Sequence, residues 1–510
     1  MPQDSIVSEL GTPARYADPG PAKPVVTSRP SPTLVGRARQ LATLADAVRT
    51  AQAGRPATVL IGGEAGAGKS RLVREFARHA QGRVLIGSCV QLGSWGVPFA
   101  PFTTVLRQLV REPGWPGAAD LLPTAEHGEL GRLLPELGEP AGRADDAYHS
   151  AARALLFEQT LALLRRLALG TPLTLVIEDA QLADRSTRDL LAFLVGNQHV
   201  LRGVVIVMTF RSDELCRTHP LRPLLAELSR VGWTERIDLP RLTRDEIADQ
   251  IAAIIGAEPS PTYADSVFRR SGGNPLFVEH LIGRAAARPD SLRDLVLARL
   301  HELPADTTEL LQVASLAGNR LGHGLLAEVS GLGEANLSRA LRPALAGDVL
   351  AEDCGGYEFR HALMQEAIAQ DLLPGERSLL HARYAEAIAA NPSLVPAGRA
   401  AMSAAHHWHA ARDVTQALIS AWQAAAEAGR SLAYPEQLSM LALVLELWDR
   451  VPDAANRIGA DHVAVLNETG RVCRLGGDAA RATALVAAAA RAVSESGPRL
   501  GRWPSPGLPR

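Results

Sequence analysis

The sequence predicts a multidomain chain in which a doubly wound parallel α/β sheet comes first and helical modules follow. Apolar strand patterns alternate with helical ones from residue 57 to residue 240. This alternation is typical of a parallel sheet with helices on both faces. The alternation stops at residue 243, and beyond residue 379 only helical spacing remains. With 510 residues, the chain is also too long for a single hydrophobic core.

The composition indicates helical cores and no overall electrostatic preference for a partner. Hydrophobic residues make up 46% of the chain and aromatic residues only 4%, so Ala, Leu and Val must build most of the cores. The net charge of −2 gives no overall case for binding nucleic acid or an anionic membrane. The four cysteines are far apart, which indicates neither a zinc site nor a disulfide framework. Without a signal peptide or a long apolar run, the sequence predicts a cytoplasmic protein.

The first strand leads into a loop with the spacing of a phosphate-binding loop, or P-loop. A β-branched apolar run at 58–61 is followed by G-x-x-x-x-G-K-[ST]. The glycines let backbone N–H groups surround a phosphate, Lys69 supplies charge to the β- and γ-phosphates, and the Ser70 hydroxyl can ligate Mg²⁺. The alternative is a glycine-rich turn with a surface lysine, but lysine otherwise occurs only at Lys23 in this arginine-rich chain. The predicted nucleotide-binding residues here are Gly63, Glu64, Ala65, Gly66, Ala67, Gly68, Lys69 and Ser70.

Candidate catalytic residues stand at the ends of later strands and join Lys69 of the P-loop. A buried-strand pattern at 173–177 ends in Glu178 and Asp179. By position Glu178 would hold Mg²⁺ together with Ser70, and Asp179 would orient or deprotonate the attacking water. The alternative for this acidic pair is a polar strand end that faces solvent. The next strand ends in Arg211, which could reach the γ-phosphate or form an ordinary surface ion pair.

A turn before the first strand could contribute to an adenine site. Val35, Gly36 and Arg37 precede a helical pattern and could lay their backbone against the base, although a simple helix start fits the spacing equally well. The five strand patterns of this domain lie at residues 58–61, 83–89, 173–177, 203–211 and 236–240. A parallel sheet of this kind places its ligands beyond the carboxyl ends of the strands.

Composition shifts and helix breaks divide the chain into six parts. A Pro-, Ser- and Gly-rich leader and a Pro-rich tail are predicted to be disordered. The predicted parts are the leader 1–32, a P-loop NTPase domain 33–240, a helical lid 241–290, a winged-helix-like regulatory module 291–370, a helical repeat-like (TPR-like) region 371–496 and the tail 497–510. Thr243 and Glu246 have the spacing of a capping box at the start of the lid.

Two features of the predicted lid and module are relevant to the predicted nucleotide-binding site. In the break at residues 271–277, the glycines and Asn274 are predicted to form a left-handed cap, and Pro275 begins the next helix. The module combines three helical patterns with a hairpin around an Asp-Cys-Gly-Gly turn. His361 follows the hairpin directly, but spacing alone gives a histidine on a partly apolar helix little weight as a ligand contact.

Taken together, these motifs resemble the signal-transducing ATPases with numerous domains, the STAND class of AAA+-related NTPases. The likeness is strongest to the N-terminal part of large ATP-binding transcriptional regulators of the LuxR type. It covers residue 33 to about residue 390 and is carried by residues 34–37, 63–70, 176–184, 209–211, 273–277 and 359–363.

The resemblance implies specific roles for several residues. Val35, Gly36 and Arg37 would cradle adenine, Pro275 would close over the base, and His361 would touch the β-phosphate in the ADP-bound state. It also implies slow ATP hydrolysis that acts as a switch: ADP holds a closed monomer, and ATP with an unknown inducer or protein partner, bound through the helical region, permits self-association. The winged helix would be a regulatory clamp and not a DNA-binding element.

The sequence departs from the family pattern at three points. Gln181 and Leu182 replace a common His-Trp pair after the acidic residues. The acidic pair reads Glu-Asp, so it stays open whether Glu178 or Asp179 holds the metal. Regulators of this type are also longer, and neither a complete sensor superhelix nor a DNA-binding helix-turn-helix is identified here. The Pro-rich ending suggests a truncated or frameshifted reading frame.

Three functions are compatible with these observations. The favoured one is an ATP/ADP-switched regulator of the LuxR type that lacks its C-terminal DNA-binding domain. The first alternative is a helical interaction scaffold with a structural nucleotide site, for which partner binding would not depend on the nucleotide. The second is an autonomous ATPase or nucleotide-dependent transferase, which would require rapid turnover and for which no acceptor-substrate motif is found.

Overall fold

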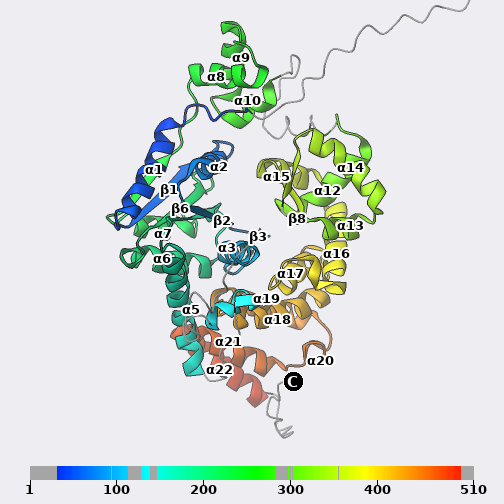
Figure 1. The fold of residues 1–510 in the computed structure, drawn as a ribbon. Coiled ribbons are helices and arrows are strands. Elements are labelled where there is room, and N and C mark those ends of the chain that lie inside the picture. Colours follow the sequence, from blue (N-terminus) through cyan, green and yellow to red (C-terminus); the bar gives the residue numbers. More distant parts are fainter. Residues whose placement is uncertain are drawn as a thin grey trace, which may run out of the picture.

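The computed structural model describes residues 31–93, 95–112, 128–137, 146–282, 297, 300, 302–353 and 355–495. In these residues a parallel-sheet domain, a lid, a winged-helix-like module and a helical arm follow one another around a ring-like outline (Figure 1). The expected tail, Cys354, the boundary between lid and module at 290/291 and most of the expected leader lie outside the described residues. The described chain begins two residues before the expected boundary at Thr33, and Ser31 is buried there.

Five parallel strands form the sheet of the first domain, which confirms the predicted fold class. They are β1 (Ala57–Gly63), β2 (Arg83–Ser88), β5 (Leu173–Glu178), β6 (Val204–Arg211) and β7 (Thr234–Asp238), in the order β2-β5-β6-β1-β7. In the register of the sheet, Gly63 lies beside Arg211 and Ser88 beside Glu178. The start of the P-loop, the acidic pair and Arg211 therefore share one carboxyl edge.

Helices cover both faces of this sheet because successive strand residues point to opposite sides. Val59 and Ile61 pack in the cluster of α1 (Ala38–Gln52) and α2 (Lys69–His79). Leu60, between them, packs in a second cluster on the other face. That cluster includes residues of α3 (Ala100–Arg111), α5 (Asp146–Leu167), α6 (Arg185–Gly196) and α7 (Leu221–Leu228).

The lid consists of three short helices with a core of their own. They are α8 (Arg244–Ile255), α9 (Pro261–Ser271) and α10 (Pro275–Leu281). The capping box of Thr243 and Glu246 is confirmed. The left-handed role expected for Asn274 is wrong: Gly272 and Gly273 have φ of 57° and 81°, whereas Asn274 has φ of −83°. Its side chain instead caps α10 by accepting a hydrogen bond from the Leu276 N–H at 3.1 Å.

The winged-helix-like module also has a separate core. Its helices are α12 (Ala305–Ser315), α13 (His323–Ser330), α14 (Glu334–Ala346) and α15 (Ala362–Asp371). The predicted hairpin is present as β9 (Leu350–Asp353) and β10 (Gly356–Phe359). A third strand, β8 (Arg320–Gly322), pairs with β10, and the sequence analysis missed it because three residues carry no recognisable alternation.

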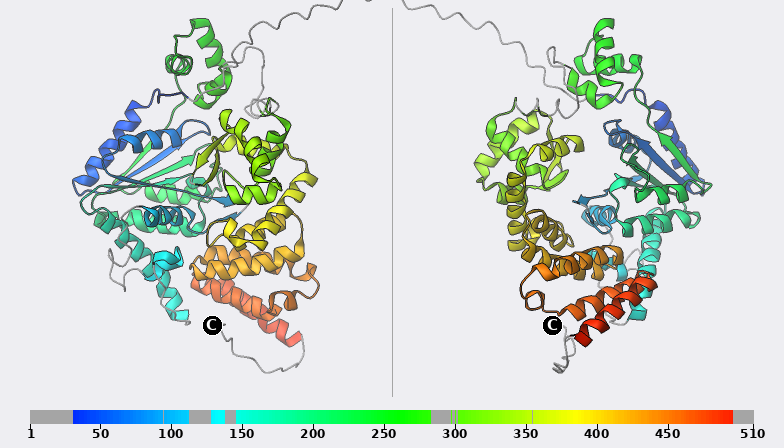
Figure 2. Two further views of the ribbon diagram at one scale, coloured as in Figure 1. Left: turned by 45° about the vertical axis from the view of Figure 1, so that its right-hand side comes forward. Right: turned by 180° about the vertical axis from the view of Figure 1, so that it is seen from behind.

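The helical arm leaves the module and passes back beneath the sheet domain (Figure 2). It comprises α16 (Pro374–Ala390), α17 (Ala400–Ala410), α18 (Val414–Arg430), α19 (Tyr434–Leu447), α20 (Ala454–Ile458), α21 (His462–Leu475) and α22 (Ala479–Glu495). Helix α19 contacts α6, and α21 contacts α5. Buried residues of α17 to α21 belong to the same cluster as those under the sheet, so this part of the arm and the sheet domain share one core. Buried residues of α16 instead share a cluster with α13 of the module.

Short elements complete the described chain. They are β3 (Gln91–Leu92), β4 (Trp95–Gly96) and the 3₁₀ turns Gly128–Arg132, Pro135–Leu137, Ala180–Leu182, Gln198–Val200, Pro392–Leu394 and Trp448–Arg450. Within the described residues, no helix combines the length and the apolar character needed to cross a bilayer.

Candidate functional site

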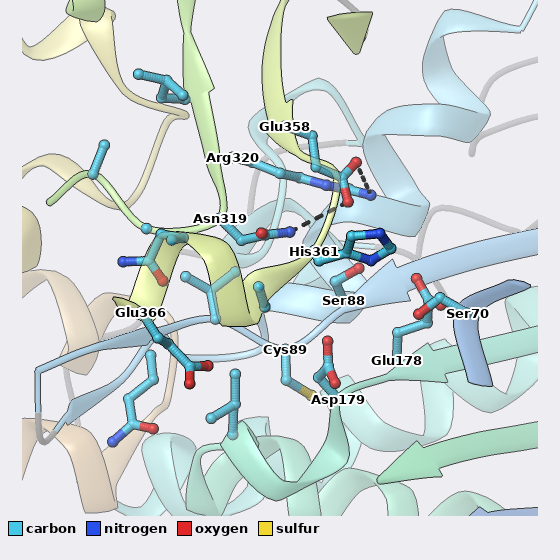
Figure 3. Close-up of a pocket in the computed structure, with 18 of the residues that line it drawn as sticks. Ser70, Ser88, Cys89, Glu178, Asp179, Asn319, Arg320, Glu358, His361 and Glu366 are labelled. Atoms are coloured by element: carbon cyan, nitrogen blue, oxygen red, sulfur yellow. Dashed lines mark hydrogen bonds and ion pairs between the residues drawn. The ribbon is translucent and has the colours of Figure 1, made fainter. Parts of the chain in front are cut away.

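A cavity of about 800 Å³ lies between the carboxyl edge of the sheet and the winged-helix-like module (Figure 3). It is lined by ten of the residues predicted from the sequence: Ala65, Gly66, Gly68, Lys69, Ser70, Glu178, Asp179, Arg211, Pro275 and His361. Val35, Gly36, Arg37, Gly63, Glu64 and Ala67 are not among the residues that line it. The P-loop, both acidic residues, the strand-end arginine, the lid proline and the module histidine thus meet at one place.

The glycines of the P-loop allow the lid to approach the loop closely. Gly66 and Gly68 have φ of 79° and 94°, where a side chain is disfavoured. A Cβ on Gly66 would lie 2.9 Å from the Cβ of Leu276 and 2.8 Å from Oδ1 of Asn274. The Asn274 side chain also donates a hydrogen bond to the Ala65 carbonyl at 2.9 Å. The lid is therefore attached directly to the loop that would hold the phosphates.

Lys69 is buried and folded into the loop. Its Nζ donates hydrogen bonds to the carbonyls of Gly63 at 2.8 Å and Glu64 at 2.9 Å. Burial lowers the pKa of Lys69 to about 8, and the nearby charge of Asp179 opposes that effect. An anionic phosphate beside the ammonium would favour its charged form further.

The acidic pair provides an oxygen site that suits Mg²⁺. Glu178 is buried at the end of β5, and burial raises its pKa while a hydrogen bond with Ser70 lowers it. Its Oε1 is buried and has no hydrogen-bond partner among the described residues. Carboxylate and hydroxyl oxygens are the ligands that Mg²⁺ prefers. The donor set of Ser70 and Glu178 therefore fits the metal that the sequence predicted there.

Asp179 has a backbone conformation that is unusual for a side-chain-bearing residue. Its φ is 54°, in the left-handed region, and its N–H donates to Thr209 Oγ1 at 3.1 Å. Gln181, which departs from the family pattern, donates its amide to Asp179 Oδ1 at 3.1 Å and accepts the Arg211 N–H at 3.0 Å. Gln181 thus fixes the carboxylate of Asp179 relative to the strand end that carries Arg211.

Arg211 connects the sheet to the module. Its guanidinium pairs with Glu366 of α15 at 3.0 Å and with Glu214 of its own domain. Burial lowers the pKa of Arg211, but the carboxylates of Glu366 and Glu214 outweigh this and hold it above its ordinary value. The ion pair considered as the alternative for Arg211 exists, and one of its partners belongs to a different module.

A second polar connection joins α2, the lid and the module, and the sequence analysis missed two of its members. Glu279 of α10 pairs with Arg71 of α2 at 3.2 Å and lies 3.9 Å from Nε2 of His361. Its carboxylate also accepts the Ser31 N–H at 3.2 Å. Burial raises the pKa of Glu279, and the hydrogen bond from Ser31 opposes this. The available signal was spacing, since Glu279 lies one helical turn after Pro275.

The module contributes a further cation that the sequence analysis did not single out. Arg320 of β8 pairs with Glu358 at 3.1 Å, and Asn319 donates to the same carboxylate at 3.3 Å (Figure 3). Burial lowers the pKa of Arg320, but Glu358, Asp353 and the nearby Glu178 together raise it. Arg320 could not be found from the sequence because the strand that carries it was not predicted.

The turn of Val35, Gly36 and Arg37 connects the P-loop with the chain that follows the last strand of the sheet. Gly36 has φ of 70°, and a Cβ there would lie 2.5 Å from Oε1 of Glu246. The buried guanidinium of Arg37 donates to the carbonyls of Ala67 at 3.3 Å and Pro240 at 2.8 Å. The turn therefore holds the P-loop against the end of the sheet domain, and its contact with adenine stays a prediction.

Comparison with known proteins agrees with this geometry. Residues 33–207 match the AAA ATPase domain family. An AAA ATPase domain implies ATP binding, typically with Mg²⁺, which agrees with the P-loop and the Ser70–Glu178 oxygen site. The matched range includes the P-loop, the acidic pair and β5, and ends within β6.

One curated relative and several solved structures are similar to the chain. An uncharacterised protein of Rhizobium meliloti (strain 1021) is 26% identical over 415 residues, which are 70% of this chain and 37% of the relative. The chain thus spans little more than a third of that protein. A STAND protein with a tetratricopeptide repeat sensor from Pyrococcus horikoshii matches with a TM-score of 0.47 at 15% identity, covering 94% of this chain and 61% of the other. A Walker-type ATPase of Pyrococcus abyssi matches with a TM-score of 0.34 at 13% identity, covering 68% and 99%.

Proposed function

We propose that this chain is a nucleotide-switched signal-transduction ATPase of the STAND class and the ATP-binding part of a LuxR-type transcriptional regulator. The observation that carries the proposal is the shared cavity, which the P-loop and the winged-helix-like module line together. Because the module forms one wall, the presence or loss of a phosphate group in the cavity changes what the module contacts.

The proposed switch uses the pairing of Arg211 with Glu366. ATP carries a γ-phosphate that ADP lacks, and Arg211 lies at the strand end where that group would be bound. A γ-phosphate at Arg211 competes with the carboxylate of Glu366 and weakens the hold of the sheet on α15. With ADP the pair stays intact, and His361 contacts the β-phosphate. The two nucleotides therefore favour two arrangements of the module through their differential affinity.

Slow hydrolysis resets the switch in this proposal. Ser70 and Glu178 would hold Mg²⁺, which supplies positive charge to the phosphates when bound. Asp179, fixed by Gln181, orients the attacking water and accepts its proton while the bond between the β–γ bridging oxygen and the γ-phosphorus breaks. Lys69 stabilises the charge on the β- and γ-phosphate oxygens. The products are ADP and inorganic phosphate.

The proposed partners are a second copy of the chain in the ATP state and an inducer or protein bound through the arm. The alternative of a helical scaffold with a structural nucleotide site has one observation in its favour. The arm shares a continuous core with the sheet domain, so it could present a fixed surface whatever the nucleotide.

The test compares Lys69→Ala with wild type and with Arg49→Ala, which removes an exposed cation of α1. Calorimetry should show ATP and ADP binding weakened about 100-fold in Lys69→Ala only, because a hydrogen bond from a charged group contributes about 1.5–3 kcal/mol. Light scattering should show wild type as a monomer with ADP and a larger species with a slowly hydrolysed ATP analogue. Equal masses in both states, with partner binding unchanged in Lys69→Ala, would support the scaffold instead.

A further inference from the structure

Three histidines outside the predicted nucleotide-binding residues form a compact cluster where α16 meets α17. His381, His406 and His407 each offer one ring nitrogen, and these three nitrogens lie within 4.8 Å of one another. The Nδ1 atoms of His381 and His407 are 2.8 Å apart. His381 and His407 are buried, whereas His406 is partly exposed. His381 and His406 also line the cavity that the P-loop lines.

Burial of the three imidazoles disfavours their charged forms. Burial lowers the pKa of His381 to about 4 and that of His406 to about 4, and it lowers the pKa of His407 as well. A neutral imidazole carries a free nitrogen lone pair, and metal ligation requires it. The 2.8 Å contact between the Nδ1 atoms of His381 and His407 is a hydrogen bond, so an ion bound by both nitrogens displaces the proton that they share.

Neighbouring rings hold the cluster in place. The ring of His407 stacks on Tyr384 with centroids 4.8 Å apart and an interplanar angle of 12°. Trp95 of β4 packs edge-on against His406 at 6.3 Å. A Cβ on Gly93, in the same short hairpin, would lie 2.7 Å from the His406 ring. These contacts orient the rings, as outer contacts do around established metal sites.

We propose that His381, His406 and His407 bind one Zn²⁺ ion, with a fourth position left for water or a ligand in the cavity. Zinc–nitrogen distances of about 2.0–2.1 Å in tetrahedral geometry place ligand nitrogens about 3.4 Å apart. The three nitrogens, which are between 2.8 Å and 4.8 Å apart, must shift by roughly 0.6–1.4 Å to reach that separation, within the reach of small side-chain rotations. The ion joins α16 to α17 and so fixes the first hairpin of the arm beside the nucleotide cavity. This site is separate from the proposed Mg²⁺ ligands, which are oxygens of Ser70 in α2 and Glu178 at the end of β5.

The test uses full-length protein without a histidine tag, stripped of metal and nucleotide. Zn²⁺ is titrated in competition with a chromophoric chelator for wild type, His406→Gln and His409→Gln. His409 is the matched control, since it lies exposed on the same helix and outside the cluster. We expect one equivalent of Zn²⁺ bound with a Kd below about 1 μM in wild type and His409→Gln, and at least about 100-fold weaker binding in His406→Gln. Binding by His406→Gln equal to that of wild type would overturn the proposal.

A second readout does not depend on any variant. Co²⁺ added to the wild-type protein should give the intense visible absorption of a four-coordinate site, and Zn²⁺ should displace it. Bound Zn²⁺ should also raise the Tm of wild type and His409→Gln at saturating metal, because it binds the folded state preferentially. A wild-type protein that binds no Zn²⁺ with a Kd below about 10 μM, or that gives only the weak absorption of six-coordinate Co²⁺, shows that the histidines serve packing alone.

Discussion

The sheet domain meets the rest of the chain through two interfaces of opposite chemistry. Beneath the sheet, Met440 and Val444 of α19 lie in the same apolar cluster as Leu190 of α6, and all three are fully buried. At the carboxyl edge, the lid and the module each have separate cores. There, ion pairs such as Arg211–Glu366 and Arg71–Glu279 connect them to the sheet domain.

This difference indicates which parts can move when the nucleotide changes. A continuous apolar core is stabilised by roughly 25 cal/mol for each Å² of buried apolar surface, and it has no alternative arrangement of similar energy. A partly exposed ion pair contributes about 0–1 kcal/mol, so a phosphate group can replace one of its partners. We therefore expect α18 to α21 of the arm to move with the sheet domain, and the lid and the module to move against the sheet edge. The module should move together with α16, because Leu325 of α13 and Ile388 of α16 share a buried apolar cluster.

The largest effect on stability is expected from replacing a buried methionine with alanine, once in the core shared by the arm and the sheet domain and once in the core of the module. Met440 in the shared core and Met364 in the module core are 0% and 1% exposed. Met440→Ala and Met364→Ala should each destabilise their own core by about 2–5 kcal/mol. Because the cores are separate, hydrogen exchange should rise in α6 and the arm for Met440→Ala, but in α12 to α15 for Met364→Ala.

Exchange mass spectrometry of both variants in the presence of ADP checks this prediction. Leu379→Ala, at an exposed leucine of α16, serves as the control and should change neither pattern. If Met364→Ala raised exchange in α6 as strongly as Met440→Ala does, the two interfaces would be coupled and the comparison would fail.

A smaller effect on stability is expected from the ionisation of a buried carboxylate at the apolar interface. Glu436 of α19 accepts hydrogen bonds from the Arg185 N–H at 2.9 Å and the Ser186 N–H at 3.3 Å, at the start of α6. Burial raises the pKa of Glu436 above its ordinary value of 4.5, the charge of Asp184 adds to this, and hydrogen bonds from Ser186 oppose it. Burial likewise raises the pKa of Asp184. The cation Arg188 acts on both carboxylates.

The raised pKa fixes the sign of the pH dependence. The protonated form of Glu436 is favoured in the folded state, so its contribution to stability is fully present below pH 4.5 and is lost as the pH rises through the raised pKa. The contribution of this one proton to the unfolding free energy should fall between pH 5 and pH 9 by at most about 1.4 kcal/mol per pH unit. The lowered pKa values of His381 and His406 act in the opposite direction, so the contribution is measured as the difference between wild type and a Glu436 variant. Glu436→Gln should flatten that dependence, while Glu446→Gln, at an exposed position of the same helix, should keep it. A difference in unfolding free energy between wild type and Glu436→Gln that does not fall over this range would contradict the assignment.

The sequence predicted the residues of the sheet edge far better than those that reach it from other modules. The P-loop, Glu178, Asp179 and Arg211 belong to local patterns of strand and loop, which spacing records directly. Arg320 and Glu366 carry no such pattern, and Glu279 carries only its spacing of one helical turn from Pro275, because tertiary packing brings α10, α15 and the three-residue β8 to the cavity. The histidine cluster was missed for the same reason: His381 is 26 residues from His407, and the spacing matches no helical ligand motif.

The smallest effect is expected at the polar interface itself, where one carboxylate competes with the nucleotide. Glu366 is 42% exposed and pairs with Arg211, so the pair contributes no more than about 1 kcal/mol to the closed arrangement. Glu366→Gln should therefore shift the ratio of ATP to ADP affinity about three- to fivefold toward ATP, since the γ-phosphate no longer displaces a charged partner. Calorimetry with ADP and a slowly hydrolysed ATP analogue measures this ratio, with Glu328→Gln on α13 as an exposed control in the same module. A ratio that stays at the wild-type value would mean that Arg211 does not sense the γ-phosphate, and the lid connection through Glu279 and Arg71 would then be the part of the polar interface left to carry the switch.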